Sequence, residues 1–442
     1  MSSACEHSKP PRIFIYPQLP QWGAVWNGRL TPLHDHLRRS QHYTADGSCA
    51  DFFVVSNHQK PGGKMGKSSA MVAASFEWLA QKWPYWNQTA GRGLVRHLLL
   101  MPCDHGPGDC MYDRSFLPKK AARLGSVPLP DALNPLSPRR MVAFVNENGA
   151  PGSFNFFIRG LDIRLPSGEL HDCGPFCGTP RPQRPGRGPS RQGSVAQRVL
   201  RQFSPWLPER PEAERESLLR AARPYRLFWA GRASGRKGFR GDLFRFHTNK
   251  SNHSNHLRDG WLLHDTSGRH QPHGAATVAA TRRQGWFAES MARSDFCYSP
   301  PGQYHGDSDR YLPAVLYGCI PIFPKDGEAL PYDEVLPWAN ASLRVGLGDV
   351  ASLHTIIAAV SPARLLQMRR KLGTIWRRLL WTSIFTGASC ASTAGGSCVL
   401  AWERPGQPQR SLPPRYLGED PSQDAFATFV EVLRARLKTS ER

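Results

Sequence analysis

The segment from Ser294 to Lys325 limits the fold most strictly, because it reads as strand, loop, helix and strand in direct succession. Phe296 to Ser299 is a short apolar run stopped by a Pro-Pro-Gly turn, as expected of a buried strand. Apolar residues then recur at helical spacing until Gly318, a residue type that often follows a helix. Cys319 to Phe323 is a second apolar run. The segment therefore predicts one βαβ unit of a parallel sheet.

The helix of this unit is expected to begin at a group of short polar residues followed by an arginine. Asp307, Ser308 and Asp309 favour a helix start, because their side-chain oxygens can accept hydrogen bonds from unpaired backbone N–H groups. Arg310 then falls on the first turn, where N–H groups and the helix dipole favour an anion. We predict that this helix start binds the phosphates of a nucleotide, with Ser299 and Gly302 contributing from the loop. A βαβ unit without a ligand is the alternative.

Apolar strands alternate with helices in the rest of the chain as well, which indicates parallel sheets covered on both faces. At 442 residues the chain is long enough for two domains. The further strands are predicted at 12–16, 51–56, 97–101, 141–145 and 225–230, and helical spacing recurs at 72–79, 353–360, 365–379 and 426–437.

The sequence from Ser294 to Trp338 resembles the C-terminal signature of the exostosin-type glycosyltransferases. It has the order S-x-F-C, P-x-G, S-x-R, G-C-I-P and then L-P before a Trp. The stretches RIFIYPQLP, CADFFVV and WPYWNQTAGRGLVRHLLLMPCDHG are similar in order and spacing to the N-terminal half of the same family. This chain has Arg96-His97 where the family commonly has Asp-His.

The resemblance implies an α/β protein with two Rossmann-like domains (GT-B) facing an interdomain cleft. It also implies an inverting glycosyltransferase that moves a sugar from a nucleotide sugar, usually a UDP-sugar, to a polysaccharide or glycoprotein glycan. The expected divisions are an acceptor-side domain at 1–178, a Pro/Arg/Gly-rich linker or insertion at 179–222, a donor-binding domain at 223–384, a loose loop at 385–413 and a returning C-terminal helix at 414–442.

Such a transfer needs a general base and a stabiliser of the charge that develops on the diphosphate. Arg310 is the first choice for the diphosphate, because guanidinium is always charged and its planar donors match phosphate oxygens. Gly231 ends the strand at 225–230 and the family has an Arg after it; Arg232, Arg236 and Arg240 all remain open, with Arg232 and Arg240 as our candidates. Asp104 and His105, in the place of the family's H-D-x-G element, are the candidate bases. The sequence shows no metal-bridging Asp-x-Asp at a strand end, so we expect no metal cofactor.

Pro313 departs from the family pattern, which often has Glu or Asp about three residues after the signature Arg to bind the ribose hydroxyls. Proline is acceptable in the first turn of a helix, but its side chain cannot bind ribose. Either Asp307 or Asp309 takes that role, or donor recognition differs, or activity is lost. The second hypothesis is therefore a catalytically inactive exostosin-like protein that binds or organises glycans.

The formal net charge of +22 would suit an acidic glycan acceptor, nucleotide phosphates, a membrane surface or nucleic acid. Much of the excess lies between Arg181 and Arg240 and around Arg369 to Arg378, so we favour the interpretation that it belongs to solvated linker and helix surfaces. No nucleic-acid-binding motif accompanies the charge, so we expect no nucleic-acid partner. The resemblance implies a nucleotide-sugar donor and a glycan acceptor as partners, with assembly alongside related transferases left open.

The family is usually anchored in the Golgi by an N-terminal membrane helix, and the resemblance therefore places the protein at the Golgi membrane or in its lumen. The sequence shows no long apolar run and no signal peptide. Its ten cysteines could form a few disulfides. Three local pairs stand out: Cys103 with Cys110, Cys173 with Cys177, and Cys390 with Cys398.

Overall fold

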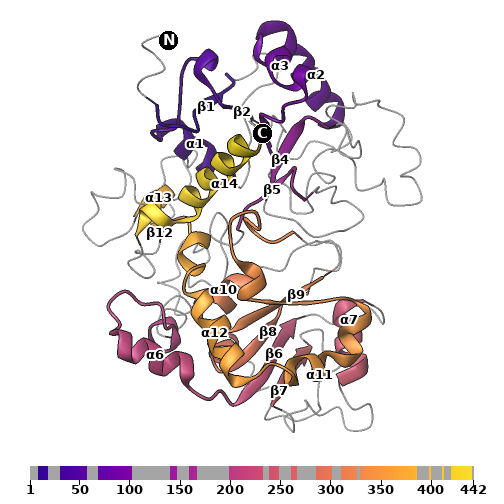
Figure 1. Ribbon diagram of the computed structural model, residues 1–442, viewed down its shortest axis with the longest axis vertical. Coiled ribbons are helices and arrows are strands. Elements are labelled where there is room, and N and C mark those ends of the chain that lie inside the picture. Colours follow the sequence, from indigo (N-terminus) through magenta and orange to yellow (C-terminus); the bar gives the residue numbers. More distant parts are fainter. Residues whose placement is uncertain are drawn as a thin grey trace, which may run out of the picture.

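The computed structural model shows two α/β lobes, one above the other in Figure 1. It describes residues 8–17, 30–56, 68–101, 140–146, 159–166, 199–231, 238–247, 260–265, 285–300, 310–325, 329–385, 398–399, 411–412 and 420–440.

The N-terminal lobe is built on a parallel sheet of five strands in the order β1-β2-β3-β4-β5. Ile13 also bridges to Tyr43 on the outer side of β1, so chain segments lie on both sides of the first strand. Every described side chain of β1, β2 and β3 is buried, which explains why these strands are continuous apolar runs. The strands are β1 (Ile13–Ile15), β2 (Phe52–Val55), β3 (His97–Leu100), β4 (Val142–Asn146) and β5 (Ile163–Arg164).

The C-terminal lobe is built on a second parallel sheet, in the order β10-β9-β8-β6-β7. Its first strand, β6, pairs with β7 on one side and β8 on the other, so the chain reverses its direction of progress across the sheet at β6. Such a reversal is the topological switch point of a doubly wound fold. The strands are β6 (Tyr225–Gly231), β7 (Trp261–Asp265), β8 (Ser294–Tyr298), β9 (Ile320–Pro324) and β10 (Leu343–Val345).

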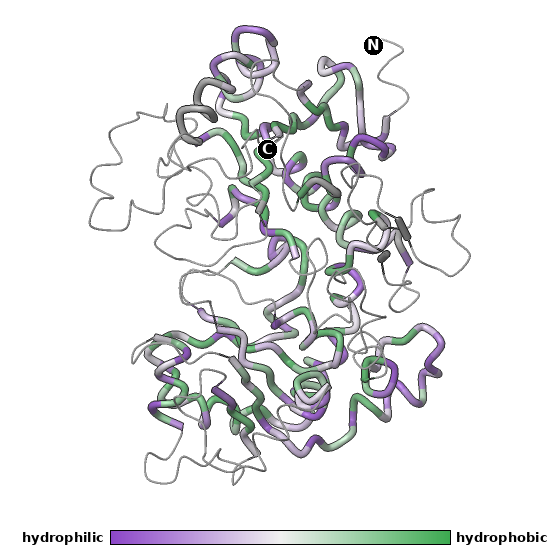
Figure 2. Tube along the Cα trace, turned by 180° about the vertical axis from the view of Figure 1, so that it is seen from behind, coloured by the Kyte–Doolittle hydropathy of each residue, from purple (hydrophilic) through white to green (hydrophobic). Residues whose placement is uncertain are grey.

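Helices pack around both sheets, and the apolar residues concentrate on the strands at the centre of each lobe (Figure 2). The α-helices are α1 (Thr31–Arg39), α2 (Ser68–Lys82), α3 (Tyr85–Gln88), α6 (Glu212–Arg220), α7 (Phe239–His247), α9 (Trp286–Ala292), α10 (Tyr311–Leu316), α11 (Leu353–Ala358), α12 (Pro362–Leu372), α13 (Thr382–Phe385) and α14 (Ala425–Ser440). Short 3-10 helices cover Gly47–Cys49, Ala90–Arg92, Trp338–Asn340, Gly348–Ser352, Trp376–Leu379 and Pro421–Gln423.

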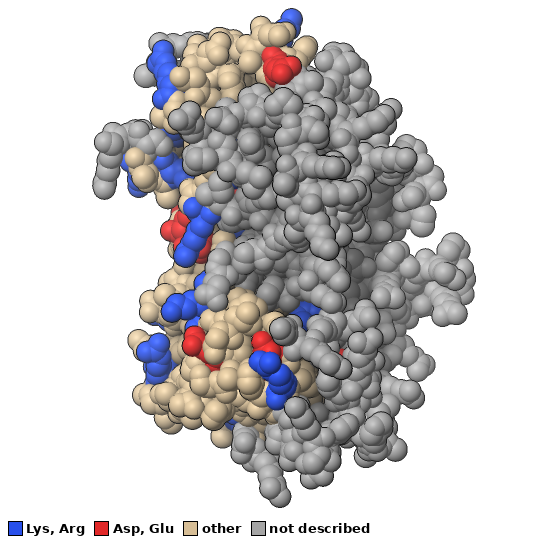
Figure 3. Space-filling model, turned by 90° about the vertical axis from the view of Figure 1, so that its right-hand side faces the viewer, with Lys and Arg blue, Asp and Glu red and all other residues tan. Residues whose placement is uncertain are grey.

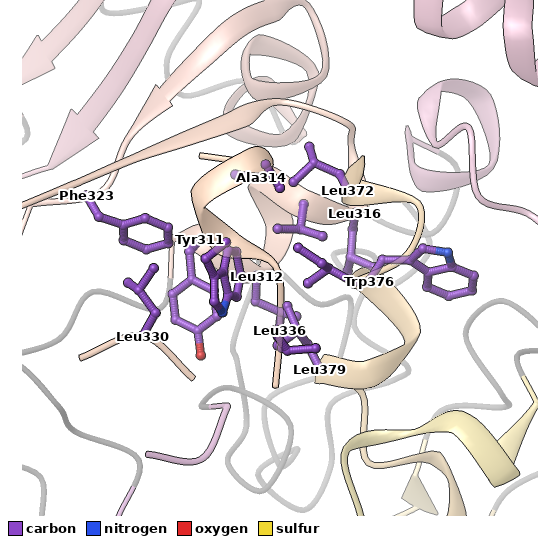
Figure 4. Close-up of a cluster of buried hydrophobic side chains, with 14 of the residues drawn as sticks. Tyr311, Leu312, Ala314, Leu316, Phe323, Leu330, Leu336, Leu372, Trp376 and Leu379 are labelled. Atoms are coloured by element: carbon purple, nitrogen blue, oxygen red, sulfur yellow. The ribbon is translucent and has the colours of Figure 1, made fainter. Parts of the chain in front are cut away.

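The α10 helix is buried on all of its sides. Figure 4 shows Tyr311 beside Phe323 and Leu330, and Leu316 beside Leu372. Because no residue of this helix faces solvent, packing rather than helix propensity holds it in place, and it tolerates a proline in its third position.

The last helix, α14, packs against the first lobe and lies beside α1 in Figure 1. The ring of Phe426 meets His36 of α1 at 4.4 Å. Arg436 donates to the backbone oxygens of Leu161 and Asp162 at 2.6 and 2.9 Å and pairs with Glu334, a residue that follows β9. This helix therefore contacts both lobes. The division of the chain at 178, 222, 384 and 413 stays a prediction.

The structure confirms the α/β fold of two Rossmann-like domains and each of the predicted strands. It also contains regular elements that we did not predict. Residues 199–220, within the predicted linker or insertion, contain a helical turn at 199–203 and α6, with Trp206 and Leu207 buried. The His-rich stretch 247–273 contains the buried strand β7. Within the expected loop 385–413, β11 (Cys398–Val399) pairs with β12 (Ser411–Leu412).

A disulfide between Cys297 and Cys319 joins β8 to the residue before β9, with Cα atoms 5.8 Å apart. Cys49 is also disulfide-bonded. The three local cysteine pairs suggested by the sequence involve residues outside the described part. Within the described ranges we find no helix whose length and apolar content would let it traverse a bilayer.

Basic and acidic side chains occur side by side on the described surface of the face shown in Figure 3. Several arginines of the described residues form ion pairs: Arg210 with Glu214, both Arg220 and Arg370 with Glu216, and Arg378 with Glu431. Part of the basic excess is therefore neutralised locally.

Candidate functional site

The candidate site lies at the carboxyl ends of β6 and β8, where the order of strands reverses. In parallel α/β sheets the segments leaving two such strands separate to opposite faces, and ligands bind in the crevice between them. Gly231 ends β6, and Tyr298 ends β8. The next described residues after these strands are Gly238 and Ser299, respectively.

Arg310 reaches back across this edge from the start of α10. Its Nε donates a hydrogen bond to the backbone oxygen of Ala230 at 3.1 Å. Its guanidinium carbon lies 5.9 Å from the ring centre of Trp229, at the limit of a cation–π contact. Arg310 is half-buried and occupies the N-cap position of α10, just before the first turn on which the sequence analysis placed it. A guanidinium is thereby fixed at the end of β6 and presents planar donors to an anion.

Gly231 makes this position of Arg310 possible. A Cβ atom on Gly231 would lie 2.6 Å from Nη2 of Arg310 and 3.0 Å from Cζ2 of Trp229. Both distances are shorter than ordinary van der Waals contacts, so only glycine admits the guanidinium at this point.

Arg240 is a second cation near the same edge. It is the second residue of α7, and its Nε is buried without a hydrogen-bond partner among the described residues. Burial lowers the pKa of Arg240, and Tyr298 at the end of β8 partly opposes that shift. The hydroxyl of Tyr298 donates to the backbone oxygen of Phe239 at 3.4 Å, which ties α7 to β8. A half-buried guanidinium with an unsatisfied donor is costly unless an anion binds it.

Two polar residues that we did not predict end the neighbouring strand β7. Asp265 lies opposite Gly231 in the strand register and is almost fully buried. His264 has a buried Nδ1 without a partner among the described residues, and burial lowers its pKa while Asp265 opposes this. An acidic residue at the end of the strand beside the phosphate-binding strand is the usual ribose acceptor of dinucleotide-binding folds. The sequence signal was the run WLLHD, apolar residues followed by two polar ones.

The structure places only some of the predicted site residues. Gly231, Arg240 and Arg310 come together around β6 and β8. Ser299 directly follows β8 and is buried, with its N–H donating to the backbone oxygen of Ile322 at 2.9 Å. Arg232, Gly302, Asp307, Ser308, Asp309, Asp104 and His105 lie outside the described residues, and their roles stay predictions.

His97, the family's histidine position in the N-terminal lobe, lies in a buried aromatic cluster. Its Nε2 is hydrogen-bonded to the Tyr16 hydroxyl at 2.9 Å, and its Nδ1 lies 3.4 Å from Oγ1 of Thr89. Burial lowers the pKa of His97 to about 3 and raises the pKa of Tyr16. A neutral, buried imidazole of this kind supports packing and does not act as a base at neutral pH.

Among the described residues, no group of three or more His, Cys, Asp or Glu side chains is arranged to hold a metal ion. The absence of a metal cofactor stays a prediction.

Part of this chain is similar to a known family of domains. Residues 199–360 match the model of the exostosin GT47 domain, which confirms the resemblance carried by the signature around Arg310. The matched range contains the whole β6–β8 edge.

Three plant proteins illustrate the similarity. A probable glucuronosyltransferase of Oryza sativa subsp. japonica is 38% identical over 91 residues, which is 21% of each chain. The probable beta-1,4-xylosyltransferase IRX10L of Arabidopsis thaliana is 35% identical over 86 residues, 20% of each chain. A second probable glucuronosyltransferase of Oryza sativa subsp. japonica is 24% identical over 306 residues, 69% of this chain and 54% of the relative. The alignments thus span between about a fifth and about half of these relatives.

Proposed function

Starting from the exostosin GT47 domain at residues 199–360, we propose that this chain transfers a sugar from a nucleotide sugar to a glycan, with inversion at the anomeric carbon. The donor is a UDP-sugar, and the acceptor is a polysaccharide or the glycan of a glycoprotein. The relatives are named for transfer of glucuronate and xylose, so a uronic acid or a pentose is the class of sugar to test first.

The position of Arg310 carries the proposal. Its guanidinium is held at the switch point of a parallel sheet by Ala230 and is accommodated by the missing side chain of Gly231. As the bond from the sugar to the diphosphate breaks, negative charge grows on the leaving phosphate oxygens. A fixed guanidinium stabilises that charge without having to reorganise.

Other residues complete the donor site in this proposal. Arg240 supplies a second cation from α7, and its unsatisfied Nε gains an acceptor when the diphosphate binds. Asp265 accepts the ribose hydroxyls, a role that Pro313 cannot fill because its side chain has no polar atom. Asp104 or His105 removes the proton of the acceptor hydroxyl, and no metal ion is needed, so EDTA leaves the rate unchanged.

The compartment in this proposal is the lumen of the Golgi. The disulfide between Cys297 and Cys319 supports it, because such bonds persist in oxidising compartments and are rare in the cytosol.

Release of UDP from a panel of UDP-sugars, with and without xylan-type acceptors, tests the activity. Arg310→Ala is expected to lower kcat/KM by about 10²–10³-fold, the usual cost of losing one charge-stabilising donor. Arg293→Ala is the matched control, since Arg293 is exposed, lies in the same lobe at the end of α9 and forms no ion pair with a described residue. Equal losses in both variants would show that Arg310 has no special role.

Pro313 supports one second function, a glycan-binding protein without turnover. It stands in the buried third position of α10, near the place where the family often has an acidic residue. Absence of UDP release with every donor, together with retained binding of the acceptor glycan, would favour this second function.

A further inference from the structure

A cavity of about 500 Å³ lies on the C-terminal lobe, well away from the donor edge. Part of α6 and the segment before it form one side, and the end of α12 with the following 3-10 helix forms the other. Trp206 and Trp376 line it from the two sides, and both are almost fully buried in the core beneath it. Figure 4 shows Trp376 at the margin of the buried cluster around α10.

The α10 helix fixes the distance of this cavity from Arg310. The indole N–H of Trp206 donates to the backbone oxygen of Val315 at 2.8 Å, in the last turn of α10. Arg310 stands at the opposite end of that helix, six residues long and so about 9 Å in length. The α10 helix runs antiparallel to the strands. The cavity therefore lies towards the amino ends of β8 and β9, and the donor site lies at the carboxyl ends of the strands. The two sites are therefore separate.

Arg215 is the one arginine of the cavity lining whose charge has no partner among the described residues. Arg370 forms an ion pair with Glu216. The pKa of Asp420 is lowered mainly by hydrogen bonds from Ser422 and also by the nearby charge of Arg377. Arg215 makes no ion pair or side-chain hydrogen bond there, and its Nε is buried and unsatisfied. A buried guanidinium donor of this kind costs free energy until an acceptor reaches it.

The lining combines two features that together suit one class of ligand. Carboxylates such as Glu212 at the rim accept hydrogen bonds from hydroxyl groups. The unpartnered fork of Arg215 matches a carboxylate, to which a guanidinium donates two parallel hydrogen bonds. We propose that this cavity binds a uronic acid residue of a glycan chain, with Arg215 holding its carboxylate.

This second site is distinct from the proposed transfer site and needs no turnover. It would hold part of an acidic acceptor while another part reaches the donor edge, or hold a separate chain. Its test therefore omits the donor, so that failure of transfer and failure of this proposal remain distinguishable.

The experiment is calorimetric titration of the full chain with a xylo-oligosaccharide that carries one glucuronic acid, and with the neutral oligosaccharide of equal length. We expect the acidic ligand to bind at least tenfold more tightly, and excess UDP to leave its binding unchanged. Arg215→Gln should abolish the preference for the acidic ligand. Arg364→Gln, an exposed position at the start of α12, should retain it.

Equal binding of the two oligosaccharides, or a preference that survives in Arg215→Gln, would overturn the proposal. Competition by UDP would also overturn it, because the ligand would then lie at the donor edge. Thermal unfolding of both variants confirms that they are folded, and Arg215→Lys should restore part of the preference because it keeps the charge but loses the fork.

Discussion

The two lobes have sheets of the same kind but place different chemistry on them. In the C-terminal lobe, the carboxyl edge of the central strands carries Arg310, and Arg240 lies nearby. In the N-terminal lobe, the side chain that follows β1 is Tyr16, which stacks on His97 and Phe53 in a buried and uncharged cluster.

The aromatic residues of the N-terminal lobe therefore stabilise its fold, whereas the arginines of the C-terminal lobe are suited to binding a ligand. Buried nitrogen atoms of Arg240 and His264 at the C-terminal edge have no partner among the described residues. In the aromatic cluster, by contrast, His97 is hydrogen-bonded to both Tyr16 and Thr89. The lobes should therefore respond differently to reductant, to acid and to the same glycine substitution.

At neutral pH, removal of the disulfide should give the largest effect on stability, and in the C-terminal lobe. Cys297→Ala with Cys319→Ala opens a loop with a sequence separation of 22 residues, which should cost about 3 kcal/mol. Hydrogen exchange at β8 and β9 should accelerate far more than exchange at β2 and β3. Equal acceleration in both sheets would show that the lobes unfold as one unit.

A methyl group at Gly47 should destabilise the N-terminal lobe. Its Cβ would lie 2.2 Å from Cε2 of Tyr85, a ring of the aromatic cluster, so the packing must shift at a cost of about 1–3 kcal/mol. Gly91→Ala is the control, because the atom nearest to its Cβ would be 3.9 Å away. Denaturant unfolding measures both, and similar losses would contradict the packing argument.

Acid should also weaken the N-terminal lobe through His97. Its pKa is about 3 in the folded protein and about 6.5 when unfolded, so below pH 6.5 the unfolded state binds the additional proton. Stability should therefore fall as the pH falls, by about 1.4 kcal/mol per pH unit down to pH 3. His97→Gln should remove that part of the slope of unfolding free energy against pH. An unchanged slope would contradict the burial of a neutral imidazole.

A glycine-to-alanine substitution at Gly231, in the C-terminal lobe, should lower activity and leave the stability of the fold almost unchanged. Gly231→Ala brings its Cβ against the end of the flexible Arg310 side chain, which can move aside, and to 3.0 Å from Cζ2 of Trp229, which must shift by a small amount. We expect kcat/KM to fall about tenfold and the unfolding midpoint to stay within about 2 °C, since the strain is relieved by side-chain motion. Gly348→Ala, with no atom near its Cβ, is the control.

The strands could be predicted because both faces of a parallel sheet are covered, which makes each strand a continuous apolar run. Elements were missed where the apolar run was short or was interrupted by polar residues. The apolar part of β7 is only Trp261 to Leu263, between polar and His-rich segments. In the segment before β6, the buried Trp206 and Leu207 stand among many Arg and Pro residues.

The site could be predicted only in part, because its contacts join distant residues. The sequence indicated both Arg310 and Gly231 as site residues. It could not show that the guanidinium of Arg310 lies where a side chain on Gly231 would be. The pairing of Cys297 with Cys319 likewise depends on the register of β8 against β9. Asp265 was missed because its position beside Gly231 follows from the strand order alone.

The contacts of α14 with the first lobe set an order of events during synthesis. His36 and Leu161 leave the ribosome long before Phe426 and Arg436, which contact them in the finished protein. At typical translation rates the nascent first lobe waits on the order of tens of seconds for that cover. During this time its apolar surface beside α1 is open to solvent, which makes the half-made chain a natural client for chaperones.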